Sequence, residues 1–280
     1  MPDVEVVLRQ PATLAEGPLW DPDRNCLWWV DIDAGLIHRF DPQTGSDTAT
    51  DVGVPVGAVS LQQDGELILA AGKGFATYDG TLSWLGEVDA GSRMNDGKCD
   101  PAGRFLAGTM SDEPGTAAFY RLERGEISQL FGDVTISNGL GWSPDGETFY
   151  YIDTPREAVW AFDYDVGSGG LARRRTFIDL HDVTGRPDGM AVAADGTIWV
   201  AMSRGGAAVR EFTADGRPGR VVRLPTPFVT SVTFGGPDLS DLYVTTARRA
   251  LSGEPDPLAG CVFRVRGLEI EGVPVARYRP

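Results

Sequence analysis

Six short runs of aromatic and β-branched residues, each entered through a tight polar turn, are spaced along the 280-residue chain. A representative unit is W-S-P-D-G-E-T-F-Y-Y-I-D from Trp142, and the other five begin at Trp20, Gln62, Cys99, Val192 and Phe234. Such a turn leading into such a run is typical of a hairpin entering a β-strand. Segments that alternate in and out follow several runs, at 37–42, 118–122, 159–164, 209–212 and 262–265, and predict half-buried strands.

The units recur at intervals of about 40 to 50 residues, the spacing of four-stranded propeller blades. Six of them nearly fill the chain, so we predict an all-β fold, a six-bladed β-propeller with four-stranded blades around a central channel, as a single domain over residues 1–280. A two-sheet sandwich is the alternative, but a sandwich does not require this periodicity. The N-terminal V-E-V-V-L-R is expected to pair into the last blade beside the C-terminal V-P-V-A-R-Y, which would close the ring.

Residues at the same phase of each unit should lie at the same radius and height in such a ring. The position five residues before each turn is occupied by Glu16, Gly57, Asn95, Asn138, Asp188 and Ser231. Because the innermost strands line the channel, these residues are predicted to form a ring near one mouth. Gly57 is expected to leave a gap in that ring through which a ligand enters.

Four members of this ring carry carboxylate or amide oxygens. Two carboxylates that are close together repel each other, and each is costly to remove from water, whereas a bound cation relieves both problems. Oxygen ligands of this mixed kind suit Ca²⁺, Mg²⁺ or Mn²⁺, and Zn²⁺ fits a site with open positions. Any one such residue beside Gly could be a turn or cap residue, but four at one phase favour a site. His38 and His181 fall outside the phase, and His38 is expected on the surface.

Composition and charge narrow the class of protein. The net charge of −15 disfavours binding to nucleic acid or to an anionic membrane. Three distant cysteines predict neither a disulfide framework nor a structural zinc site. The N-terminus lacks the pattern of a signal peptide, and no apolar run reaches the length of a membrane span. A cytoplasmic protein is therefore expected, and a closed ring without heptads favours a monomer.

Several long motifs resemble the regucalcin/gluconolactonase family. They include L-A-E-G-P-L-W-D-P, R-M-N-D-G-K-C-D-P-A-G-R-F-L-A-G-T-M, I-S-N-G-L-G-W-S-P-D-G and P-D-G-M-A-V-A-A-D-G, in the family's order from about residue 14 onward. The resemblance implies a six-bladed propeller that holds one divalent metal ion and hydrolyses sugar lactones. By the same resemblance, Glu16, Asn138 and Asp188 are the metal ligands.

The resemblance also implies contacts with the substrate. Arg93 and Asn95 of the R-x-N-D-G motif match family residues that contact the sugar, and Glu113, after the G-T-M motif, matches an acidic residue that faces the sugar in some relatives. A surface cation is the alternative reading of Arg93. Lys98 is expected to lie further along the same strand.

These residues predict a metal-dependent lactonase acting on an aldonolactone, such as a glucono-, xylono-, arabino- or galactonolactone. Asp188 would act as the general base on the attacking water while also touching the metal. No G-x-S-x-G motif is present, so a serine nucleophile is not indicated. Two alternatives stay open, a calcium-binding regulatory protein and an esterase or organophosphate hydrolase on the same scaffold.

Overall fold

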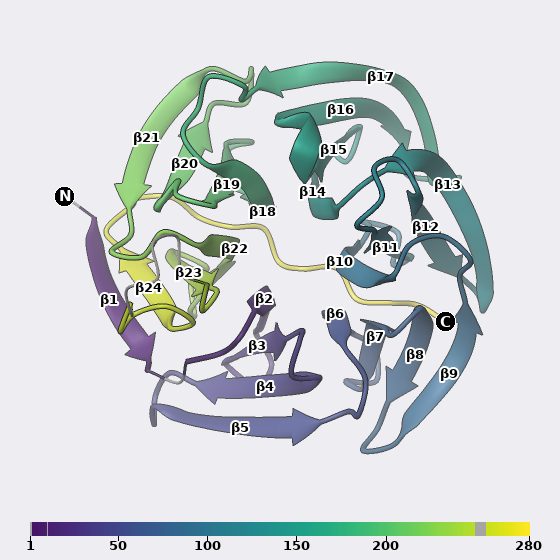
Figure 1. Ribbon diagram of the computed structural model, residues 1–280, viewed down its shortest axis with the longest axis horizontal. Helices are drawn as coiled ribbons and strands as arrows, with labels where there is room; N and C mark the ends of the chain where they lie inside the picture. The colour runs from purple at the N-terminus through teal and green to yellow at the C-terminus, as the bar shows by residue number, and fades with distance from the viewer. Residues whose placement is uncertain (1, 10, 250–255) are drawn as a thin grey trace.

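The computed structural model describes residues 2–9, 11–249 and 256–280. Six four-stranded antiparallel sheets stand around a common centre like the blades of a propeller (Figure 1). The chain is therefore a six-bladed β-propeller, as the sequence predicts.

Five blades are each built from four consecutive strands, with the first strand innermost (Figure 1). The first blade holds β2 (Ala15–Asp21), β3 (Cys26–Asp31), β4 (Leu36–Asp41) and β5 (Ser46–Asp51), and the second holds β6 (Val56–Leu61), β7 (Leu67–Ala71), β8 (Gly74–Tyr78) and β9 (Leu82–Glu87). The third holds β10 (Arg93–Cys99), β11 (Phe105–Met110), β12 (Ala117–Glu123) and β13 (Glu126–Val134). The fourth holds β14 (Ser137–Trp142), β15 (Thr148–Asp153), β16 (Ala158–Asp165) and β17 (Gly170–Asp179), with the short 3₁₀ helix η1 (Thr154–Arg156) after β15. The fifth holds β18 (Arg186–Val192), β19 (Ile198–Ser203), β20 (Ala208–Phe212) and β21 (Pro218–Arg223).

The sixth blade closes the ring by joining the N-terminal strand to the last three strands of the chain. It contains β22 (Val229–Gly235), β23 (Asp241–Thr246) and β24 (Val262–Arg266), and the N-terminal β1 (Asp3–Leu8) is its outer strand. Glu5 lies opposite Arg264 in the ladder and accepts a hydrogen bond from its guanidinium. The predicted pairing of the N-terminal strand with the last blade is confirmed.

The C-terminal V-P-V-A-R-Y does not lie beside β1, and this part of the prediction is wrong. The place next to β1 is filled by β24, and Pro274 lacks the N–H that a ladder needs. Residues 271–279, here called the C-terminal strap, instead cross the centre of the ring (yellow in Figure 1). The strap bonds to four blades, at Leu61, Gly103, Ala194 and Leu239, in the turns between the first and second strands or at their edges.

Local sequence explains the hairpin turns. Asp64, Asp145 and Asp195 each accept a hydrogen bond from the backbone N–H two residues later, at 2.9 to 3.0 Å. This side-chain bond stabilises the turn before the second strand begins. The repeated Asp-Gly pairs in the sequence are thus the turns between β6 and β7, β14 and β15, and β18 and β19.

Large aromatic side chains fill the space within and between blades. Trp20 stacks on Tyr243 of the sixth blade with ring centroids 5.5 Å apart, and Trp199 meets Phe234 edge to face. Trp142 packs on Phe149 of its own blade. Each such pair adds about 0.5 to 1.5 kcal/mol beyond burial, so these contacts hold neighbouring blades in register.

His38 is not a surface residue, contrary to expectation. It lies on β4, only 3% exposed, with its ring stacked on Trp29 and its Nδ1 atom 2.6 Å from Asp47 Oδ2. The outer strand β5 supplies Asp47 and covers this side chain. The alternating pattern of this strand therefore did not reveal that His38 is buried and paired with Asp47.

The three cysteines, Cys26, Cys99 and Cys261, are free thiols in the interior. Among the described residues, no helix is long and apolar enough to cross a membrane.

Candidate metal and substrate site

A register break interrupts the innermost strand of every blade near one end. The breaks lie at Glu16/Leu19, Val56/Ala58, Met94/Gly97, Ser137/Leu140, Pro187/Met190 and Val229/Ser231. A bulge of this kind bends the strand and redirects a side chain, and bulges are common beside active sites. Here it occurs at the phase that the sequence analysis singled out.

A polar cavity of about 350 Å³ opens at this end of the channel. Its lining includes Glu16, Arg93, Asn95, Asn138 and Asp188, from four different blades. The structure thus brings together all three predicted metal ligands and two of the predicted substrate contacts. Asp33, Asp112, Arg204 and Arg249 also line the cavity, so that both signs of charge face it.

Two members of the predicted ring do not reach this cavity. Gly57 leaves no gap, because a Cβ at this position would lie within 3.0 Å of the Met94 and Asn95 backbone. The neighbouring strand fills the space, so the entry route expected at Gly57 is wrong. Ser231 lies deeper, on a narrower part of the channel, and Thr230 lines the cavity instead. In β22 the register break at Val229/Ser231 begins one residue earlier, relative to the repeat, than the break in β18.

A chain of hydrogen bonds links polar side chains of the third and fourth blades and ends on the backbone of the fifth. Arg93 Nη1 donates to Asn95 Oδ1 at 2.6 Å, and Asn95 Nδ2 donates to Asn138 Oδ1 at 3.1 Å. Asn138 Nδ2 donates to Thr154 Oγ1 at 2.7 Å, and that hydroxyl donates to the Pro187 carbonyl at 2.9 Å. Each amide accepts through its oxygen and donates through its nitrogen in this chain, which gives both amides one orientation. The oxygen of Asn138 is therefore turned toward Asn95 and the interior of the site.

Glu16 and Asp188 place two carboxyl groups close together in this cavity. Burial raises the pKa of Glu16 well above its ordinary value, and the charges of Asp188 and Asp96 raise it further. Burial also raises the pKa of Asp188 to about 7, opposed by a hydrogen bond with Ser203 and aided by Asp96. Both shifts show that this cavity disfavours two ionised carboxyl groups, and a nearby positive charge would favour their ionised forms.

The donor set fits a divalent cation. Two carboxylates and the Asn138 amide oxygen are hard oxygen ligands, and a cation between the carboxylates would remove their repulsion. Within the described ranges, no group of three or more His, Cys, Asp or Glu side chains is arranged to hold a metal. A cation here would therefore depend on the amide oxygen as its third protein ligand, with other positions open to water or substrate.

Glu113 does not lie in the lining of the cavity. It is exposed on the turn after β11, and only its backbone bonds within that turn. The adjacent Asp112 lines the cavity instead. The role of Glu113 stays a prediction, and the structure offers Asp112 as the nearer acid.

Thr154 was missed by the sequence analysis. It begins η1, directly after Asp153 at the end of β15, and is only 4% exposed. The repeat phase could not reveal it, because a helix follows the second strand in this blade alone among the residues that the structure describes. The D-T-P sequence, with Pro at the start of a helical turn, was the available signal.

Comparison with known proteins agrees with this architecture. Residues 14–248 match the family model described as the SMP-30/gluconolactonase/LRE-like region. Regucalcin of Danio rerio is 38% identical over 288 residues, covering 98% of both chains. The solved structure of a calcium-binding protein, regucalcin, from Agrobacterium tumefaciens superposes with a TM-score of 0.93 at 30% identity, over 98% of this chain and 97% of the other. A luciferin-regenerating enzyme superposes with a TM-score of 0.92 at 28% identity over the whole of both chains. The chain belongs to the SMP-30/gluconolactonase/LRE-like family.

Proposed function

We propose that the protein is a metal-dependent lactonase that opens a sugar lactone, such as gluconolactone or a pentonolactone, to the sugar acid. The supporting observation is the convergence of Glu16, Asn138 and Asp188 with Arg93 and Asn95 in one polar cavity. Its volume of about 350 Å³ suits a small polar substrate. The name of the family to which the chain belongs includes gluconolactonase, which supports this proposal.

Arg93 and Asn95 are the residues that would orient the sugar. A guanidinium carries five N–H donors, so Arg93 can hold Asn95 through Nη1 and still donate to a sugar oxygen. Asp33 and Asp112 offer acceptors for sugar hydroxyls at the rim. A polyhydroxylated ring needs both donors and acceptors in fixed places, and this cavity has both.

Asp188 is the proposed general base. Its carboxylate takes a proton from water as the water oxygen bonds to the lactone carbonyl carbon. The ring C–O bond then breaks as Asp188 returns that proton to the ring oxygen, which becomes a hydroxyl of the ring-opened sugar acid. A divalent cation held by Glu16, Asn138 and Asp188 would supply Lewis-acid stabilisation of the negative charge on the carbonyl oxygen.

A second candidate function is binding of calcium as a regulatory signal. The Agrobacterium relative is described as a calcium-binding protein, and this chain has the same fold. A purely regulatory site has no need of Arg93 and Asn95 beside the carboxylates, so we favour the enzyme. An esterase or organophosphate hydrolase would use the same cavity with a less polar substrate.

The experiment is a pH-stat assay of the protein with one divalent metal at a time. Glucono- and pentonolactones, aryl acetates and a phosphotriester are the substrates, and Asp188→Asn and Asp112→Asn are the variants. We expect lactone opening by the wild type, a loss of about 100-fold or more in Asp188→Asn, and a smaller loss in Asp112→Asn. Calcium binding without turnover of any substrate would favour the regulatory protein, and faster turnover of aryl esters would favour the esterase.

A further inference from the structure

A second cavity lies at the opposite end of the channel from the metal and substrate site. On β14, Asn138 faces the first cavity and Trp142 the second; on β18, Asp188 faces the first and Val192 the second. The second cavity, of about 300 Å³, lies between the blade turns and the C-terminal strap. It shares no lining residue with the polar cavity.

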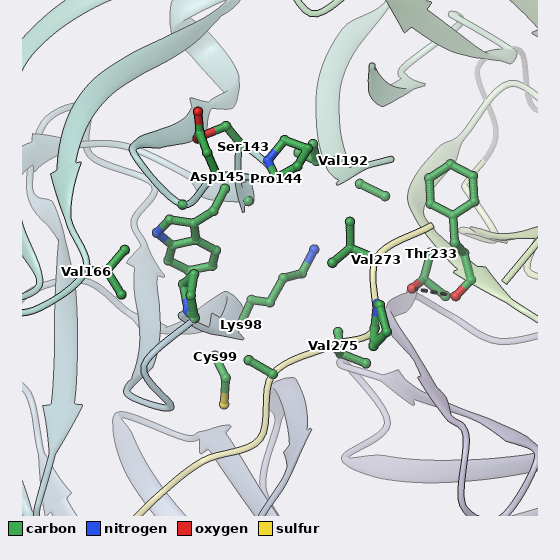
Figure 2. A pocket seen from close by; sticks show the side chains of 18 residues that line it. Lys98, Cys99, Ser143, Pro144, Asp145, Val166, Val192, Thr233, Val273 and Val275 are labelled. Carbon is green, nitrogen blue, oxygen red and sulfur yellow. Dashed lines mark hydrogen bonds between the residues drawn. The ribbon is translucent and has the colours of Figure 1, made fainter. Parts of the chain in front are cut away.

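The walls of this second cavity are mainly apolar. Trp142, Pro144, Val192 and Phe234 line it from three blades, and Val273 and Val275 line it from the strap (Figure 2). Val273 is 46% exposed, which is unusual for a large apolar side chain in this protein. A concave apolar surface with a few polar groups is the usual form of a small-molecule site.

Lys98 brings a positive charge into this apolar space. Figure 2 shows its side chain extending from β10 into the cavity, beside the part of the strap that carries Val273 and Val275. Its ammonium donates to the Met190 carbonyl at 3.2 Å, and no carboxylate in the described part of the chain comes within 4.0 Å of it. Burial lowers the pKa of Lys98, and the charge of Asp96 further along the channel opposes this. An ammonium has three donors, so Lys98 can donate to acceptors besides the Met190 carbonyl.

The other polar groups of the lining do not pair with the Lys98 ammonium. Asp145 is exposed at the rim and is engaged by the Ser143 hydroxyl at 2.5 Å and the Glu147 backbone N–H at 3.0 Å. Thr233 lies across the cavity and adds a hydroxyl. A single cation at the base of an apolar cavity complements one negative charge on an otherwise apolar molecule.

We propose that this cavity binds a small monocarboxylate with an apolar body, its carboxylate on Lys98 Nζ and its body against Trp142 and the strap. A phosphate is disfavoured because its higher charge and hydration require several donors, and the lining offers one cation. The assignment does not rest on the proposed lactonase activity, since the two cavities have separate linings.

Isothermal titration with 3-phenylpropionate, on the metal-loaded protein, tests this proposal. We expect one site per chain with a Kd of about 0.1 to 1 mM, and binding at least about tenfold weaker for the neutral 3-phenylpropanamide. Lys98→Met should weaken binding of the carboxylate by about tenfold or more, whereas Asp188→Asn should leave it unchanged. The second variant separates this cavity from carboxylate binding at the metal.

Val273→Asp is the variant that tests the cavity without changing Lys98. The Val273 side chain is exposed, so the variant should keep the fold. A carboxylate on the strap should repel the negatively charged ligand and weaken its binding by several-fold. Val221→Asp on β21, at a valine 40% exposed and outside the lining, is the matched control. No binding up to about 10 mM, equal affinity for the amide, or a loss of binding in Asp188→Asn would overturn the proposal.

Discussion

The hydroxyl of Thr154 sets the orientation of the Asn138 amide. Thr154 Oγ1 donates its proton to the Pro187 carbonyl, so it can only accept from Asn138, and Asn138 Nδ2 lies 2.7 Å away. The amide oxygen of Asn138 is consequently directed to the side where Asn95 and the carboxylates lie. A residue of one blade thus uses the backbone of the next to orient a candidate metal ligand.

Replacement of Thr154 should weaken metal binding. Thr154→Val keeps the shape but removes the acceptor, so Asn138 loses its fixed orientation, and we expect a loss of about tenfold or more in metal affinity and in lactone kcat/KM. Titration of the metal by calorimetry measures the first effect. Thr154→Ser keeps the hydroxyl and should restore both. Unchanged metal affinity in Thr154→Val would show that the hydroxyl does not position Asn138.

Asp112 and Glu113 form an adjacent pair in which only the first faces the cavity. We expect Asp112→Asn to raise KM for a sugar lactone by several-fold, because an acceptor for a sugar hydroxyl is weakened. Glu113→Gln, on the exposed turn, should leave KM within about twofold. Steady-state kinetics with one lactone suffices, and a larger effect at Glu113 would restore the role that the resemblance implies for it.

Gly189, next to Asp188, is required by the close approach of β22. A Cβ at this position would lie within 3.0 Å of three Ser231 atoms, including its backbone Cα. We expect Gly189→Ala to lower the free energy of unfolding by about 2 kcal/mol, through overpacking between two innermost strands. Gly132→Ala is the control, because the nearest atom there is at 3.4 Å. Urea unfolding of both variants measures the effect. Equal losses of unfolding free energy in the two variants would contradict this explanation.

The ion pair between Glu211 and Arg220 should give a pH-dependent contribution to stability. Two hydrogen bonds of 2.7 Å from the guanidinium lower the pKa of Glu211, and Arg220 also lies over the Trp199 ring at 5.1 Å. A lowered folded-state pKa stabilises the fold above the unfolded-state pKa, and this stabilisation is lost as pH falls through the folded-state value.

Glu211→Gln measures that contribution. Since Arg220 is partly exposed, we expect the wild type to exceed the variant by only about 1 kcal/mol in unfolding free energy at neutral pH. The difference should shrink toward zero as pH falls below about 4. Urea unfolding at several pH values gives the curve, and a difference that grows on acidification would contradict the assigned sign.

The sequence predicted the fold because one repeat fixes both the strands and the turns. The shared position in the repeat predicted that Glu16, Asn95, Asn138 and Asp188 lie together, and all four line one cavity. It failed for Ser231, where the bulge starts one residue differently and brings Thr230 into the lining. A pattern of two-residue alternation carries no information on where a strand bulges.

Residues outside the repeat were harder to predict. His38 is buried because Asp47 of the next strand pairs with it, and such a partner is not visible in a single strand's pattern. The C-terminal strap has strand-like residues, yet it bonds to four blades and forms one wall of the cavity that contains Lys98. Its course depends on tertiary contacts with distant turns, which local sequence does not specify.

The most direct test of the account is a count of bound metal against lactonase rate. Protein stripped with a chelator is titrated with Ca²⁺, Mn²⁺, Mg²⁺ or Zn²⁺, while metal content and the opening of gluconolactone are measured above the spontaneous rate. We expect negligible activity without metal, recovery that saturates at one ion per chain, and no recovery when Asn138→Leu and Asp188→Asn are combined. Full activity in metal-free wild-type protein would contradict the central claim that Glu16, Asn138 and Asp188 serve catalysis by holding a cation.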